Sequence, residues 1–318
     1  MSFISCKSIN GKNKYYLEKS LRLQEGKIKK YSVYLKNYTP NNRIKLDKYE
    51  EVLKNKITKD LIENAVNSFQ KNNIFDKDII KLIEEIKINY QEIVKKLNDK
   101  QLQDVIDRFT INFTYESNAL EGNSLTLKDV AMILDEKFLT RGRPLRDVYE
   151  AINTRKAIEL IFKNKFNINE KDIIKLHKIL VSNTGIPNGY KTLPNFLLDK
   201  NVKTTSPENV HKEIKKLLNW YENDNKHTLE KAAIFHGKFE EIHPFEDGNG
   251  RVGRLLINIM LLKNNYPPII IRKTQRESYF HALEAFDNNY SDKLRRFFLE
   301  KYKVTYENFF KIYIKYLK

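Results

Sequence analysis

The sequence predicts a mainly α-helical protein with a small β-hairpin near its N-terminus. Over most of the 318 residues, Ile, Leu and Val recur three and four positions apart among Lys and Glu, which is the spacing of one helix face. Two segments before residue 40 are instead rich in Tyr, Val and Leu in partial alternation, which favours strands. Only 10 Gly and 8 Pro are present, so long flexible linkers are not expected.

The first 45 residues form a strongly basic segment. Strands are predicted at residues 14–22 and 29–37, with a turn at Gly26 between them. The segment carries eleven lysines and arginines against two glutamates, in a chain whose formal net charge is +17. Such a surface is either simply solvated or binds an anionic partner; with five tyrosines nearby, nucleic acid is the partner that this composition fits.

Helical periodicity begins near residue 47 and continues to the C-terminus. Local signals mark several helix ends: Asp76 is a candidate N-cap, Gly122 a candidate C′ residue, and Thr126 with Asp129 resembles a capping box. Residues 183–210 interrupt the pattern, and NFLLDK at 195–200 is expected to be a short exposed strand. Helices are predicted at 58–72, 76–99, 102–120, just after 126, 147–164, 169–182, 208–222, 228–241, 251–263, 276–288 and 291–316.

Composition narrows the function classes. No apolar run is long enough to cross a bilayer, and the first twenty residues lack the apolar segment of a signal peptide. Cys6 is the only cysteine, so an internal disulfide is excluded. We therefore expect a cytoplasmic protein with no membrane partner.

One short segment combines the groups that bind phosphate. Gly248, Asn249 and Gly250 precede a predicted helix, where glycines let the backbone approach a ligand and free N–H groups face it. Arg251 and Arg254 lie three apart on the first turn, so both guanidinium groups are expected to point toward the same anion. Together these residues predict a polyphosphate site.

The same segment carries a base and a metal anchor. A carboxylate beside phosphates, here Asp247, is the usual protein ligand of Mg²⁺. His243 lies four residues earlier and, with an ordinary pKa of about 6.5, can take a proton from a hydroxyl at neutral pH. This set predicts nucleotide transfer, a reaction that depends mainly on positioning and charge neutralisation.

Residues 243–254, HPFEDGNGRVGR, resemble the Fic-family motif H-x-F-x-[D/E]-G-N-G-R-x-x-R at every fixed position. The apolar helices on both sides are also similar, and the resemblance covers about residues 100–300. It implies a Fic-type helical bundle with a β-hairpin flap, and a division into the basic segment 1–45, a helical region 46–135 and a catalytic core 136–318. In the family, the histidine deprotonates a hydroxyl of the target protein, which attacks the α-phosphate of ATP.

The resemblance assigns a role to each residue of the loop. His243 would be the base and Asp247 the Mg²⁺ ligand. The backbone of residues 248–250 would form the anion hole, and Arg251 and Arg254 would hold the outer phosphates of ATP.

Three other segments resemble parts of Fic proteins. Residues 117–123, SNALEGN, are similar to the inhibitory motif [S/T]-x-x-x-E-[G/N], which makes Glu121 the inhibitory residue. Residues near 190–200 resemble the flap that pairs with an extended segment of the target protein, as a strand added to a sheet edge. Tyr279 is the candidate beside the adenine, although an aromatic at this spacing is nearly as often a core residue.

The resemblance implies an autoinhibited protein adenylyltransferase that uses ATP and Mg²⁺. Two alternatives stay open: the reverse reaction, in which Glu121 positions water to remove AMP, and a nucleic-acid-binding regulator acting through residues 1–45. A homodimer is a further expectation. His236, on the apolar helix before the loop, is expected to be a buried, hydrogen-bonded histidine and not a ligand.

Overall fold

The protein is described from a computed structural model that covers residues 2–22, 28–42, 45–134, 142–195 and 204–316. The chain divides into two compact units, Met1–Ser68 and Phe69–Lys318. The division predicted from the sequence, with boundaries after residues 45 and 135, stays a prediction. The residues NFLLDK, expected to be a strand, lie almost wholly outside the described residues.

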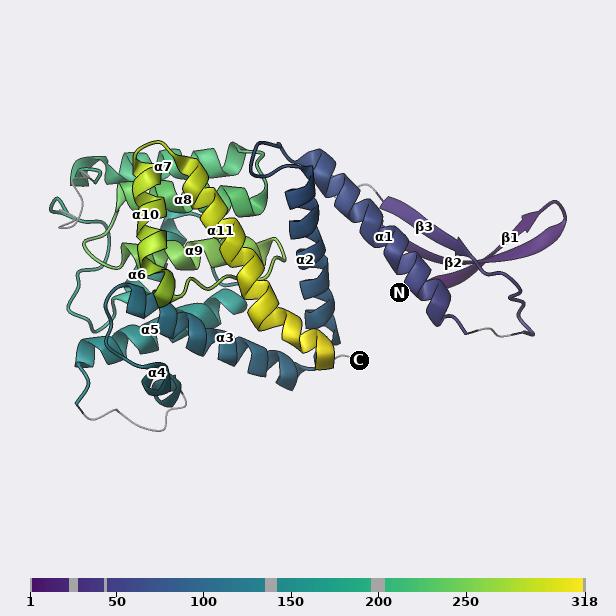
Figure 1. Ribbon diagram of the computed structural model, residues 1–318, viewed down its shortest axis with the longest axis horizontal. Helices are drawn as coiled ribbons and strands as arrows, with labels where there is room; N and C mark the ends of the chain where they lie inside the picture. The colour runs from purple at the N-terminus through teal and green to yellow at the C-terminus, as the bar shows by residue number, and fades with distance from the viewer. Residues whose placement is uncertain (1, 23–27, 43–44, 135–141, 196–203, 317–318) are drawn as a thin grey trace. The chain divides into compact units, whose positions relative to one another are not determined.

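The first unit is a three-stranded antiparallel sheet with one helix. Strands β1 (Phe3–Ile9), β2 (Lys12–Arg22) and β3 (Ile28–Tyr34) follow one another in the sheet, and α1 (Asp47–Ser68) lies along one face (Figure 1). The sequence-based hairpin is therefore incomplete, because β1 adds a third strand. The turn between β1 and β2 is Asn10-Gly11. Both residues have positive φ, and this pair suits a tight two-residue hairpin.

The core of this unit lies between the sheet and α1. Asp60 on α1 accepts hydrogen bonds from Lys29 at 2.5 Å and from the Tyr31 hydroxyl, and so ties the helix to β3. The packed apolar side chains are Tyr15, Leu17, Leu21, Tyr31, Val33 and Leu35 of the sheet side and Leu53, Ile57 and Leu61 of α1. The other face of the sheet has no such cover from α1.

The second unit is a helical bundle. The helices are α2 (Lys77–Lys96), α3 (Asp99–Leu120), α4 (Leu127–Leu134), α5 (Leu145–Phe162), α6 (Glu170–Leu180), α7 (Pro207–Asn223), α8 (Thr228–Ile242), α9 (Asn249–Lys263), α10 (Arg276–Asp287) and α11 (Ser291–Thr305). The final predicted helix ends early, because a π-turn at Tyr306–Phe310 and a 3-10 turn at Lys311–Tyr316 replace its last part. Among the described helices, none combines the length and hydropathy needed to span a bilayer.

Capping explains where several helices begin and end. The Asp76 side chain accepts the N–H of Ile79, and Thr126 and Asp129 bond each other's backbone N–H, as a capping box requires. Gly122 follows α3 with φ +91°, a conformation that glycine adopts without strain. These predicted signals are confirmed.

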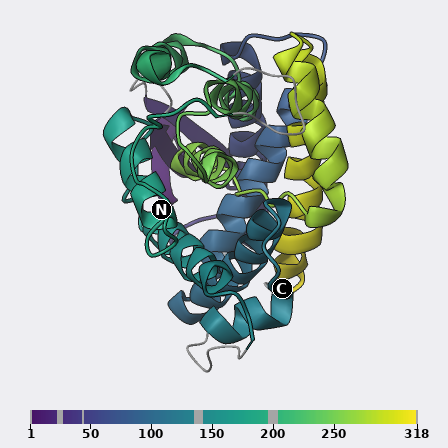
Figure 2. The same ribbon diagram turned by 90° about the vertical axis from the view of Figure 1, so that its left-hand side faces the viewer.

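Helix α9 is the centre of the bundle. Residues Val252–Leu261 are buried on every side, as expected for a helix that is apolar all round. Helices α8, α6, α5 and α3 all contact it, and Figure 2 shows it in the middle of the other helices. The N-terminal end of this central helix carries the loop described next.

Candidate active site

The loop between α8 and α9 has a fixed, unusual backbone. His243 ends α8 in the left-handed conformation, with φ 49° and ψ 61°, and Gly248 has φ +83° directly before α9 begins at Asn249. Such a conformation is costly for a residue with a Cβ and indicates that the surroundings hold His243 in place.

Buried contacts hold the loop. The Asn249 side chain bonds both backbone groups of Phe245, accepting from its N–H and donating to its carbonyl, each at 2.9 Å. The Phe245 ring is fully buried and stacks on the His177 ring, with centroids 3.8 Å apart and planes 2° from parallel. His177 in turn contacts the Asp247 carbonyl through Nε2 at 3.0 Å. The loop is therefore rigid before any ligand binds.

His243 is suited to act as a base. Its Nδ1 lies 3.3 Å from the Glu240 carbonyl oxygen, and the tautomer that makes this hydrogen bond leaves the Nε2 lone pair free. Burial, followed by the positive charge of Lys191, lowers the pKa of His243 to about 4. The imidazole is therefore neutral at pH 7, as proton abstraction requires.

Asp247 is ionised and half-exposed. Burial alone would raise its pKa, but the charges of Arg251 and Arg146 and the Gly248 N–H outweigh burial and lower the pKa. Arg146 on α5 contacts the carboxylate at 2.6 Å. This ion pair could not be predicted from sequence spacing, because Arg146 lies 101 residues away from Asp247. Among the described residues, no group of three or more His, Cys, Asp or Glu is placed to hold a metal, so a cation at Asp247 would need oxygen ligands from a substrate or water.

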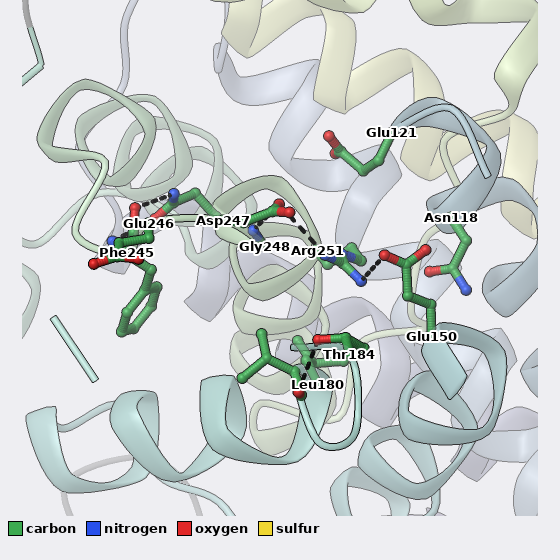
Figure 3. Close-up of polar contacts among 12 residues, drawn as sticks. Asn118, Glu121, Glu150, Leu180, Thr184, Phe245, Glu246, Asp247, Gly248 and Arg251 are labelled. Atoms are coloured by element: carbon green, nitrogen blue, oxygen red, sulfur yellow. Dashed lines mark hydrogen bonds and ion pairs between the residues drawn. The ribbon is translucent and has the colours of Figure 1, made fainter. Parts of the chain in front are cut away.

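Arg251 lies differently from the sequence-based expectation. Its guanidinium is buried and faces Glu150 at 3.1 Å and Asp247 at 3.5 Å (Figure 3), and it does not line the cavity described below. In this structure the guanidinium groups of Arg251 and Arg254 face different carboxylates, and the expectation that both point to one anion stays a prediction. Glu150, the buried carboxylate on α5 that pairs with Arg251, is a partner that sequence spacing could not reveal.

Arg254 forms an ion pair with Glu121, the candidate inhibitory residue. Arg254 Nη2 lies 2.7 Å from Glu121 Oε1, and the buried guanidinium also donates to the hydroxyl and carbonyl oxygens of Ser117 at 3.0 and 2.8 Å. Figure 3 shows the Glu121 side chain reaching from the end of α3 toward the loop. A Cβ added to Gly250 would collide with the Glu121 carboxylate, so that carboxylate lies directly against the expected anion hole.

The aromatic candidate is buried. The Tyr279 ring packs in the interior, and its hydroxyl contacts His236 Nε2 at 2.6 Å, which confirms that His236 is a buried, hydrogen-bonded histidine. The Arg254 guanidinium lies 5.9 Å from the Tyr279 ring centroid. Tyr279 thus lies next to Arg254 in the interior, and its place beside an adenine stays a prediction.

The described start of the flap is fastened to the loop. The Lys191 N–H donates to the Pro244 carbonyl at 2.9 Å, and the Asn195 amide donates to the carbonyls of Phe245 and Glu246 at 2.8 and 3.2 Å. The Lys191 side chain is buried, which lowers its pKa to about 8. The rest of the predicted flap, residues 196–200, lies outside the described residues.

These groups surround one cavity of about 650 Å³, within the range of small-ligand sites. The loop provides His243, Asp247 and residues 248–250, and Glu121 and Arg254 line the cavity beside it. Helix α10 provides a further part of the lining, with Arg276, Glu277, Tyr279, Phe280, His281, Leu283, Glu284 and Asp287. A base, an ionised carboxylate, an N-terminal helix end and a buried arginine thus meet in one space, which suits transfer of a phosphorus-containing group.

Comparison with known proteins identifies this domain. Residues 167–261 match the Fic/DOC family model. The chain is 29% identical to protein adenylyltransferase fic-1 of Caenorhabditis elegans over 181 residues and 31% identical to protein adenylyltransferase Fic of Drosophila melanogaster over 176 residues. Each match covers 54% of this chain and 36% of the relative, so the chain spans only about a third of these curated relatives.

Solved structures give the same family. A Fic-domain-containing signaling protein from Bacteroides thetaiotaomicron is 26% identical, with a TM-score of 0.64 over 71% of this chain and 94% of that one. A Fic family protein from Desulfovibrio desulfuricans is also 26% identical, with a TM-score of 0.65 over 76% and 75%. Together with the loop at residues 243–254, these matches show that the chain carries a domain of the Fic/DOC family.

Proposed function

We propose that the protein is a protein adenylyltransferase, which transfers AMP from ATP to a hydroxyl side chain of a target protein. The observation that carries the proposal is the cavity in which His243, Asp247 and the N-terminal end of α9 meet. The names of the C. elegans and Drosophila relatives support the same reaction.

In this reaction His243 Nε2 takes the proton of the target hydroxyl, whose oxygen attacks the α-phosphorus of ATP. A P–O bond to the target forms, the bond to the β-phosphate bridging oxygen breaks, and pyrophosphate leaves. The backbone N–H groups of residues 248–250 and the helix dipole would stabilise the negative charge on the phosphoryl oxygens. Asp247, ionised and half-exposed on the cavity, fits Mg²⁺, which would neutralise phosphate charge when bound.

Glu121 would inhibit this reaction by occupying Arg254. The outer phosphates of ATP need a cation near Gly250, and the Glu121 carboxylate lies there already, 2.7 Å from the guanidinium. ATP and Glu121 would then exclude each other, which makes the ion pair an autoinhibitory contact.

The test is transfer of label from ATP carrying a radioactive α-phosphate, read as self-modification. We would compare Glu121→Gly with Glu121→Gly/His243→Ala, because inhibition by Glu121 could hide activity in the unaltered chain. Loss of a positioned base should reduce labelling by on the order of 10²–10⁴-fold. His211→Ala, on the exposed side of α7, is the matched control and should keep full labelling.

Two outcomes would contradict the proposal. Equal labelling by Glu121→Gly and Glu121→Gly/His243→Ala would show that His243 is not the base. Label that arrives from the γ-phosphate and not from the α-phosphate would indicate transfer of a phosphate instead of AMP.

Further proposals concern the target-binding segment and the direction of the reaction. The segment near 190–200 is proposed to bind the target, because its described start is bonded to the catalytic loop. Removal of AMP, a homodimer and a cytoplasmic location stay predictions from the sequence. A target carrying AMP would separate the two directions, since Glu121→Gly should lose removal if the carboxylate positions water.

A further inference from the structure

The face of the N-terminal sheet opposite α1 has a distinctive set of side chains. Because side chains alternate along a strand, the residues on this open face follow from the register. Tyr16 on the central strand is opposite Ser5 and Tyr34, Glu18 is opposite Phe3, and Lys14 is opposite Lys7. On the other face, Leu17 and Tyr31 belong to the core under α1.

Aromatic rings are gathered at the middle of the open face. The Tyr16 and Tyr34 ring centroids lie 5.4 Å apart, and Tyr34 and Phe3 remain 47% and 49% exposed. Lys7 Nζ lies 4.7 Å from the Tyr16 ring centroid, and Lys30 Nζ lies 5.7 Å from that of Phe3. Rings of this size usually contribute to a core or an interface, so a patch left on the surface indicates a partner with flat, unsaturated groups.

Cations flank these rings along the strands. Lys14 precedes Tyr16 by two residues on β2, and Lys30, opposite Ser20, lies beyond the rings in the other direction. The six positions from Lys14 to Ser20 correspond to about 20 Å. The Lys30 side chain itself reaches back to Glu18, so the patch is a short aromatic strip with lysines at its Lys14 end that are unpaired within the described part of the chain.

Glu18, an acidic residue on this face, does not neutralise the positive charge of the face. Glu18 is buried and accepts from Lys7 at 2.9 Å and from Lys30 at 2.5 Å. Two cations thus surround one carboxylate. Lys12 and Lys14 have no carboxylate partner among the described residues, so they are available to an external anion.

We propose that this open face binds single-stranded nucleic acid. Bases would stack on Tyr16, Tyr34 and Phe3, while phosphates would contact Lys12, Lys14 and the net positive cluster of Lys7, Lys30 and Glu18. A duplex hides the faces of its bases, and an acidic peptide has no flat group for the rings. Both fit the same charge but leave the aromatic strip unused. The site belongs to the first compact unit, whereas α9 belongs to the second.

The experiment measures binding of a fluorescein-labelled oligothymidylate to the full chain by anisotropy, at several salt concentrations. We expect the logarithm of the association constant to fall with that of salt with a slope of about −2, as for three phosphate contacts on a single strand. Tyr16→Ala/Tyr34→Ala should weaken binding roughly tenfold or more, the loss expected for one or two stacked bases. Tyr16→Phe/Tyr34→Phe keeps the rings and should bind like the unaltered chain.

Charge is tested with a matched pair of variants. Lys12→Glu/Lys14→Glu changes the open face, whereas Lys19→Glu/Lys48→Glu changes the net charge equally from positions off that face. Only Lys12→Glu/Lys14→Glu should abolish binding of the oligothymidylate. Circular dichroism of each variant checks that the sheet is retained.

Three results would overturn the proposal. One is no binding at low salt. The second is equal weakening by the two charge-reversal pairs, which would show that net charge alone attracts the strand. The third is equal affinity for duplex and single strand together with no effect of removing the tyrosine rings.

Discussion

Replacing Glu121 with glycine should lower the stability of the protein in the absence of nucleotide and raise its affinity for nucleotide. Glu121 is 34% exposed, whereas the Arg254 side chain is 3% exposed and would lose its only carboxylate partner among the described residues. Glu121 follows α3 with φ −91°, which any residue adopts, so the backbone itself should tolerate the change.

The size of the effect follows from the type of contact. A hydrogen bond to a charged group contributes about 1.5–3 kcal/mol, and partial exposure of Glu121 to solvent reduces this to roughly 1–2 kcal/mol. For a unit of this size, the melting temperature should fall by about 2–6 °C in the absence of nucleotide. The same free energy no longer opposes phosphate binding, so nucleotide affinity should rise about 5- to 30-fold.

The assay is thermal unfolding and calorimetric titration of both proteins with a non-hydrolysable ATP analogue and Mg²⁺. Glu121→Gln is the matched control, because it keeps the side-chain volume but lacks the charge, and it should give most of the gain in affinity. Label transfer should rise as well, by on the order of 10²-fold if the pair misplaces the α-phosphate. Equal nucleotide affinities of the unaltered chain and both variants would refute the competition between Glu121 and phosphate.

Three further predictions concern the loop and its support. Arg146→Gln should raise the affinity of Asp247 for Mn²⁺, measured by electron paramagnetic resonance, by up to about fivefold, since an exposed ion pair contributes at most about 1 kcal/mol; an unchanged affinity would show that Arg146 does not compete with the metal. Asn249→Ala should lower the free energy of unfolding by about 2–4 kcal/mol, because it leaves both buried backbone groups of Phe245 without their partner; denaturant unfolding with no loss would contradict this reading of the loop. Burial, and then the charge of Arg254, lowers the pKa of His236 to about 3, against an unfolded value near 6.5. The contribution of neutral His236 to the free energy of unfolding is therefore complete above pH 6.5. It is lost as the pH falls, by about 1.4 kcal/mol per pH unit; a urea midpoint that does not decrease from pH 6.5 to pH 5 would refute this prediction.

The sequence-based features that the structure confirms are local in the chain. The helix ends at Asp76 and Thr126 depend on side chains that bond backbone three residues away. The candidate base, carboxylate and glycines of the loop, whose roles stay predictions, also lie within eight residues. Short-range chemistry of this kind is present in the sequence itself. Strand β1, which the sequence analysis did not predict, also had a local signal in the Asn10-Gly11 pair and in the apolar residues of its sequence FISCKSI.

The parts that sequence could not predict depend on distant pairs. Arg251 looked like a phosphate ligand, but Glu150 on α5, about a hundred residues earlier, binds it in the interior. Asp247 looked free for a metal, but Arg146 from the same helix contacts it. Spacing along one helix limits which side chains share a face and does not say which neighbouring helix supplies a charge.

These distant pairs suggest how the loop keeps its charges in place. Helix α5 provides Arg146 and Glu150, which contact Asp247 and Arg251, while α3 provides Glu121, which contacts Arg254. The contacts differ in how easily a ligand could replace them. Glu150 and Arg251 are both buried, so separating them would leave an unpaired charge in the interior, at a cost of several kcal/mol. The partners Arg146 and Glu121 are partly exposed and can turn toward water. The loop thus has one permanent ion pair that fixes its shape and two replaceable ones, located where a metal and the outer phosphates would bind.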